Sequence, residues 1–195
     1  MTTQTNYSEE VTMNNISSPE NKTTIESSSP EKEFSDLFER MYQICIENNW
    51  GDPFSYARSR EIHMANHLNH KVAETFSGAD AIDEEGNECE YKSTTGKKIN
   101  ATYNGISVQP TWEEQKTYLE QKKIGRYKYH YFTRYENGKI QEIWRMDAEK
   151  VLNLALTKLK PIYESEKKRK DPRLGFNITH THINKNATQI YKRED

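Results

Sequence analysis

The segment Tyr129–Met146, YHYFTRYENGKIQEIWRM, constrains the fold more than any other part of the chain. Two runs with strand-like composition flank Asn137-Gly138, the pair most typical of a two-residue hairpin turn. The pattern predicts two antiparallel strands. The chain must therefore contain a β-sheet, and the rest of the sequence has to supply what surrounds it.

Helical and strand-like patterns alternate around this hairpin. A Thr111/Glu114 capping box predicts a helix over 111–123. Asp147 is expected to cap a helix over 147–160 whose inward face consists of Val151, Leu152, Ala155, Leu156 and Leu159. Further expected helices cover 34–48 and 56–70, and expected strands cover 78–83, 88–94 and 101–108. This order predicts an α/β fold with a mixed central sheet flanked by helices.

The first 33 residues differ in composition from the rest of the chain. They are rich in Ser, Thr, Asn and Glu and lack periodic apolar residues, so we expect 1–33 to be a disordered tail. The remaining 34–195 are expected to form one domain with a basic C-terminal segment.

No stretch of the sequence has the character of a membrane span or a secretory signal. Cys45 and Cys89 lack the spacing of a metal site or a disulfide framework. We therefore expect a cytoplasmic protein with reduced cysteines and no membrane partner.

Charge is unevenly distributed along the chain. Seven acidic and two basic residues in 1–36 give −5, so the remainder of this chain of net charge −2 carries +3. The basic excess lies in Lys122–Arg134 and Glu166–Arg173. Such patches are found in nucleic-acid-binding proteins, and also on ordinary solvated surfaces.

The segment Gly78–Thr94, GADAIDEEGNECEYKST, places charged residues where a hairpin is expected. Because side chains alternate along a strand, Glu90 and Lys92 share one face, and the hairpin brings Asp80 towards them. Asp83 lies nearer the turn and is expected to be exposed. Two neighbouring carboxylates repel one another unless a cation lies between them, and their oxygens suit Mg²⁺. Lys92 could then orient a water molecule for attack on a phosphodiester.

Asp80 followed by Glu90-Tyr91-Lys92 resembles the catalytic signature of the PD-(D/E)XK nuclease superfamily, over about Tyr56–Lys160. The form is most similar to type II restriction endonucleases, although Ala79 stands where proline is often found. The resemblance implies a homodimer that cuts double-stranded DNA with Mg²⁺, with Asp80 and Glu90 as metal ligands and Lys92 as the residue that positions water. It also implies that Glu61, from the preceding helix, supports the metal site.

Polar residues after the motif are candidates for DNA contact. Hydroxyl, amide and ammonium groups of this kind can bind phosphates or base edges. The alternative is ordinary loop polarity. The candidates are Ser93, Thr94, Lys97, Lys98, Asn100 and Gln109.

Two groups of histidines suggest other chemistry. His63, His67 and His70 fall on one helical stripe but lack the glutamate of a metalloprotease motif, so we interpret them as a polar outer stripe. His180 and His182 are expected on one face of a strand. Two alternative functions remain: a repair or recombination nuclease of the same fold, and a nucleic-acid-binding protein that cuts nothing.

Overall fold

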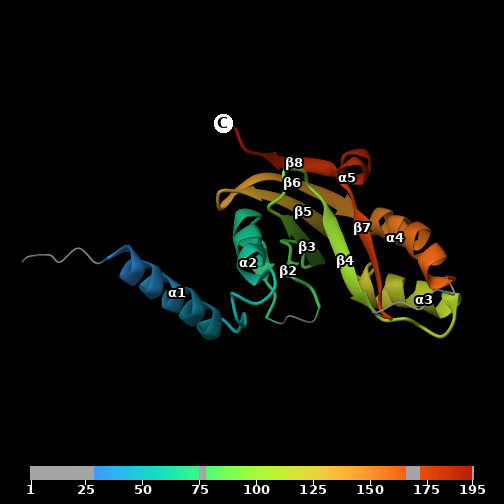
Figure 1. The fold of residues 1–195 in the computed structure, drawn as a ribbon, viewed down its shortest axis with the longest axis horizontal. Helices are drawn as coiled ribbons and strands as arrows, with labels where there is room; N and C mark the ends of the chain where they lie inside the picture. Colours follow the sequence, from blue (N-terminus) through green and yellow to red (C-terminus); the bar gives the residue numbers. More distant parts are fainter. Residues whose placement is uncertain (1–28, 75–77, 166–171, 195) are drawn as a thin grey trace, which may run out of the picture.

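The structure, a computed structural model, describes residues 29–74, 78–165 and 172–194. Its order of elements follows the predicted one, with a short strand added after the second helix and further elements at the C-terminal end (Figure 1). The helices are α1 (Pro30–Glu47), α2 (Arg58–His67), α3 (Trp112–Tyr118), η1 (Leu119–Lys123), α4 (Ala148–Tyr163) and α5 (His180–Asn186). The strands are β1 (Lys71–Val72), β2 (Ala81–Ile82), β3 (Glu88–Thr94), β4 (Ala101–Ile106), β5 (Tyr129–Glu136), β6 (Lys139–Asp147), β7 (Leu174–Ile178) and β8 (Thr188–Lys192).

Six of these strands form one mixed sheet in the order β1-β2-β3-β5-β6-β8. Strand β3 runs parallel to β5, and all other neighbours in this sheet are antiparallel. Strands β4 and β7 pair separately as a two-stranded antiparallel sheet. The predicted α/β class, with helices flanking a mixed sheet, is confirmed.

The two faces of the six-stranded sheet bury different cores. On one face, Met64 and Ala65 of α2 pack against Tyr91 and Tyr131 of β3 and β5. On the other, Phe132 and Met146 belong to a larger cluster that includes residues of α4, β4 and β7. Because Glu90 and Lys92 alternate with Tyr91 on β3, they point to the second face, on which β4 and β7 lie.

Several boundaries differ from the sequence-based expectations. Helix α1 begins at Pro30, within the segment expected to be a tail, because Ser29 accepts a hydrogen bond from the Lys32 N–H and Pro30 suits the first helical turn. The rest of the expected tail, 1–28, lies outside the described residues. Asp147 occupies the N-cap of α4 without a side-chain capping bond, and instead pairs with Lys150 at 3.4 Å.

The C-terminal part contains elements that the sequence patterns did not predict. After the basic segment, of which 166–171 lie outside the described residues, the chain forms β7, α5 and β8. The prediction of a strand at His180 and His182 is wrong. Thr179 and His182 form a capping box that begins helix α5 at His180 instead.

No helix among the residues that the structure describes is long and apolar enough to cross a membrane.

Candidate functional site

The turn between β2 and β3 places Asp80 opposite Glu90. Ala81 pairs with Cys89 and Ile82 with Glu88, so the next pair outward in this register is Asp80 and Glu90. The carboxylate of Asp80 accepts a hydrogen bond from the Tyr91 N–H at 2.7 Å, and its own N–H donates to the Cys89 carbonyl at 3.0 Å. Two strands therefore hold the Asp80 side chain against the middle of β3.

Asp83 has a different role at the turn itself. Its carboxylate accepts hydrogen bonds from the backbone N–H groups of Glu85 and Asn87, at 3.0 and 2.7 Å. The side chain is half-buried and stabilises the turn that sets the Asp80–Glu90 register. The expectation that Asp83 is exposed was therefore only partly right.

Lys92 lies beside the two carboxylates. Its ammonium forms an ion pair with Glu90 Oε1 and stands 5.1 Å from the centre of the Tyr103 ring. Burial alone would lower the pKa of Lys92, but the charges of Glu90 and Asp80 raise it above its usual value. Lys92 is therefore a cation at neutral pH and can donate hydrogen bonds, but it cannot accept a proton from water.

Glu61 reaches the same group of charges from helix α2. Its carboxylate is largely buried and pairs with the guanidinium of Arg58, one turn earlier, at 3.4 Å. Arg58 is itself almost completely buried and donates to the carbonyls of Trp50 and Ala73. Burial raises the pKa of Glu61 in spite of this partner, and the charges of Lys92 and Glu90 also act on it.

The pKa of Asp80 reflects both its burial and the charges around it. Burial, followed by the negative charges of Glu90 and Glu61, raises the pKa of Asp80 to about 8. The nearby Lys92 ammonium only partly offsets these effects. The site thus holds more negative charge than its own cations neutralise, so a proton or another cation is favoured there.

A layer of aromatic side chains supports the charged residues from behind. The Tyr103 hydroxyl lies 2.9 Å from Nδ1 of the buried His130, whose Nε2 lies 3.1 Å from the Ile124 carbonyl. Because a carbonyl can only accept, Nε2 carries the proton and Tyr103 donates to Nδ1. Burial lowers the pKa of His130 to about 4, so this histidine is neutral and fixes the Tyr103 ring beneath Lys92.

A cavity of about 300 Å³ adjoins Lys92 and Glu61. Tyr56, which is 96% exposed and has a positive φ of 54°, lies at this cavity. A second cavity of about 260 Å³ continues along β4 and β7, and the two share Asn100, Ala101 and Thr102. Together they form a hollow whose lining includes the amide or hydroxyl groups of Ser93, Asn100, Thr102, Asn177 and Thr179.

The candidate DNA-contacting residues are divided by the fold. Ser93 and Asn100 line the cavity next to Lys92, whereas Lys97 and Lys98 are exposed on the loop between β3 and β4. The Ser93 Oγ is buried and has no hydrogen-bond partner within the described part of the chain. Gln109 does not join them, because its backbone lies between α3 and α4, where its N–H donates to Gln115 and its carbonyl accepts from Tyr163.

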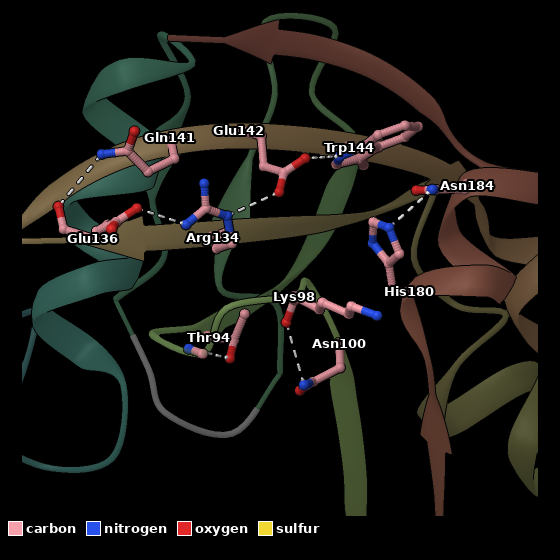
Figure 2. A network of polar contacts seen from close by, with 11 residues as sticks. Thr94, Lys98, Asn100, Arg134, Glu136, Gln141, Glu142, Trp144, His180 and Asn184 are labelled. Carbon is pink, nitrogen blue, oxygen red and sulfur yellow. Dashed lines mark hydrogen bonds and ion pairs between the residues drawn. The ribbon is translucent and has the colours of Figure 1, made fainter. Parts of the chain in front are cut away.

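Figure 2 shows Thr94, the last residue of β3, and the loop residues Lys98 and Asn100 below a polar network on β5 and β6. Thr94 accepts a hydrogen bond from the Gly96 N–H at 3.1 Å, and the Asn100 amide donates to the Lys98 carbonyl at 3.4 Å. These contacts within the loop leave the Lys98 side chain extended in the view (Figure 2).

Arg134 is at the centre of that network. It donates to Glu142 and to Glu136, at 3.0 Å in each case, and the Trp144 indole donates to Glu142 at 2.8 Å (Figure 2). Two carboxylates therefore neutralise this guanidinium. Although Arg134 lies in one of the basic segments of the sequence, its charge is used to join β5 to β6.

The carboxylates at the site suit Mg²⁺ in chemistry and in charge. In 29–74, 78–165 and 172–194, no three His, Cys, Asp or Glu side chains gather so as to hold a metal ion by themselves. Mg²⁺ commonly takes only one or two protein carboxylates and completes its shell with waters and phosphate oxygens. Asp80 and Glu90 provide two such carboxylates. Burial first, and then the charges of Glu90 and Glu61, raise the pKa of Asp80, and a bound cation would offset the repulsion between these carboxylates.

Sequence reasoning missed the residues that support the site. Arg58 could have been suspected from its position three residues before Glu61 on an expected helix. Tyr103 and His130 gave no such signal, because an aromatic residue on a strand is equally suited to simple packing.

No family model matches this chain, and no curated protein shows significant similarity to it.

Proposed function

We propose that this protein is a Mg²⁺-dependent endonuclease that hydrolyses phosphodiester bonds of double-stranded DNA at specific sequences, in the manner of a type II restriction enzyme. The observation that supports this best is the group formed by Asp80, Glu90 and Lys92, with Glu61 beside it. Free thiols at Cys45 and Cys89 support a reducing, cytoplasmic location.

Each residue of the site has a separate part in this proposal. Asp80 and Glu90 would hold Mg²⁺, which when bound lowers the pKa of a water molecule and balances charge on the phosphate. Lys92 donates a hydrogen bond that orients the attacking water or neutralises a phosphate oxygen, as its raised pKa allows. Glu61 adds negative charge and is kept in place by Arg58.

The hollow beside the site is suited to a polar substrate. Asn100 and Thr102, which line both cavities, carry amide and hydroxyl groups of the kind that contact bases and phosphates. Lys97 and Lys98 on the adjacent loop would bind phosphates, as would Thr94 through its hydroxyl. A duplex with two strands to cut also favours two copies of the chain, each contributing one site.

The test is incubation of the purified chain with plasmid and phage DNA, in Mg²⁺ or in EDTA. We expect discrete fragments in Mg²⁺ alone. Glu90→Ala and Lys92→Ala should each reduce the cleavage rate by a factor of at least about 100. Glu88→Ala is the matched control, because Glu88 is on the same strand face but pairs with Arg126 at 2.6 Å and should not affect the rate.

Other outcomes separate the alternatives. Smears or structure-selective cuts would indicate a repair or recombination nuclease. DNA that is retarded in a gel but stays intact would indicate a binding protein without catalysis. Full cleavage by both Glu90→Ala and Lys92→Ala would exclude the proposed site.

A further inference from the structure

Tyr56, which lines the cavity beside Lys92, has an unusual backbone conformation. Four residues other than glycine have a positive φ in the described part of the chain, and three of them are asparagines, which adopt this conformation more readily than most residues. The fourth is Tyr56, with a φ of 54°. For a bulky side chain this conformation costs free energy, so it persists only where the surrounding structure imposes it.

The residues on both sides of Tyr56 impose this conformation. The Asp52 carboxylate accepts a hydrogen bond from the Ser55 hydroxyl at 2.7 Å. The Ser55 carbonyl in turn accepts from the N–H of the buried Arg58 at 3.2 Å, which closes the turn that contains Tyr56. The backbone at Tyr56 is therefore fixed from outside, and contacts of its neighbours offset its strain.

This turn directs the Tyr56 ring into solvent. The side chain is 96% exposed. Phe54, two residues earlier, stacks on Phe38, whereas no residue that the structure describes forms a ring contact or a hydrogen bond with the Tyr56 side chain. Packing within the chain consequently does not explain why a tyrosine stands in this conformation, and contact with a bound molecule does.

The cavity that Tyr56 lines also contains polar groups suited to a nucleobase. Its volume is about 300 Å³, and Lys92, Ser93 and Asn100 belong to the same lining. The Ser93 Oγ is buried without a hydrogen-bond partner among the described residues, although buried polar groups are normally paired. The Asn100 amide can both donate and accept. A nucleobase offers a flat face for an aromatic ring and an edge of donors and acceptors for such groups.

We propose that the Tyr56 ring stacks on a nucleobase of the DNA substrate that leaves the base stack beside the scissile phosphate, and that Ser93 and Asn100 bind the edge of this base. The base has to leave the stack because neighbouring bases cover its faces inside a duplex. Since Lys92 lines the same cavity, the base lies close to the phosphate that is cleaved. This inference rests on the proposed function, because it states how the same site holds its substrate.

The first test compares DNA affinity with thermal stability for three variants of Tyr56. The probe is a duplex containing the sequence that the plasmid digest identifies, bound in Ca²⁺ in place of Mg²⁺. Tyr56→Leu should weaken binding about tenfold at an unchanged melting temperature, because stacking is lost. Tyr56→Phe keeps the ring and should bind as the wild type does. Tyr56→Gly should bind as weakly as Tyr56→Leu yet melt at a higher temperature, because glycine adopts a positive φ without strain.

Tyr42→Leu is the matched control for this comparison. Tyr42 is also an exposed tyrosine, but it lies on α1 and does not line the cavity, so its variant should bind DNA as the wild type does. Wild-type affinity in both Tyr56→Leu and Tyr56→Gly would overturn the inference, and cleavage by the wild type would still support the proposed function. A wild type that neither binds nor cleaves DNA would overturn both.

The second test locates the base that leaves the stack. A mismatch, placed in turn at each position next to the cut, lowers the cost of unpairing the base at that position. At one position it should strengthen binding by the wild type severalfold and by Tyr56→Leu much less, because the leucine variant has no ring to receive the base. If no mismatch strengthens binding, or if one strengthens it equally in both proteins, Tyr56 does not stack on an unpaired base.

Discussion

At the scale of single residues, the main feature of the site is Asp80, whose carboxyl group is costly to ionise. Asp80 keeps its place through the Tyr91 N–H and the turn made by Asp83, while burial and two neighbouring carboxylates act against its charge. Lys92 remains charged in the same surroundings because its neighbours are negative. One group of residues thus contains a carboxyl that tends to be neutral and an amine that stays protonated.

This arrangement predicts how Asp80 contributes to the pH dependence of stability. Its pKa rises from an ordinary value near 3.8 to about 8 on folding, so its contribution is fully present below pH 3.8 and is lost as pH rises towards 8. Without divalent cations, wild type relative to Asp80→Asn should lose about 1.4 kcal/mol of unfolding free energy per pH unit between about pH 5 and 7. Urea unfolding of both proteins at several pH values measures this. Parallel pH profiles would show that Asp80 ionises normally.

At the scale of elements, the backbone just after η1 binds the histidine that holds Tyr103 in place at the site. The chain continues α3 as a π-helical turn, after which the N–H groups of Ile124 and Gly125 both donate to the Leu119 carbonyl. The Ile124 carbonyl then binds His130, which fixes Tyr103 under Lys92. A turn distant in sequence from the hairpin therefore positions one wall of the site.

Gly125 is the residue on which this turn depends. A Cβ added there would lie 2.5 Å from the backbone oxygen of Glu120, which cannot move without unwinding the turn. We expect Gly125→Ala to lower the unfolding free energy by about 2 kcal/mol or more. For Gly96→Ala the nearest atom is the Thr94 side-chain oxygen at 3.3 Å, so the cost should be much smaller. Equal denaturation midpoints for the two variants would contradict this account.

At the scale of the whole molecule, cation binding and folding should be linked. The charge imbalance at Asp80, Glu90 and Glu61 is present only when α2, β2 and β3 are assembled. A cation that binds there consequently stabilises the native state as a whole.

Thermal unfolding near pH 8 should detect this linkage. Saturating Mg²⁺, at about 100 times its dissociation constant, should raise the unfolding free energy by about 2.7 kcal/mol and the melting temperature with it. Glu90→Ala should abolish the increase, whereas Glu88→Ala should retain it. If Mg²⁺ shifts the wild type and Glu90→Ala equally, the ion binds elsewhere.

Much of this protein follows from its sequence because the features concerned are local. The Asn137-Gly138 turn, the Thr111 capping box and the Asp80–Glu90 register all depend on residues close together in the chain, where turn chemistry and side-chain alternation decide the structure. The helix at His180 was missed although its cap is also local, because a histidine completes the capping box where glutamate or glutamine is usual.

Only the tertiary structure decided the remaining features, because they depend on contacts between distant segments. The parallel pairing of β3 with β5, the burial of Arg58 against Trp50 and Ala73, and the placing of Tyr103 under Lys92 have no signature in any short stretch of sequence. The exposed apolar side chains of α1, such as Phe34 and Leu37, make the same point. The spacing of these residues predicts an apolar helical face. Whether the rest of the same chain covers that face depends on where the helix lies relative to the packed sheet.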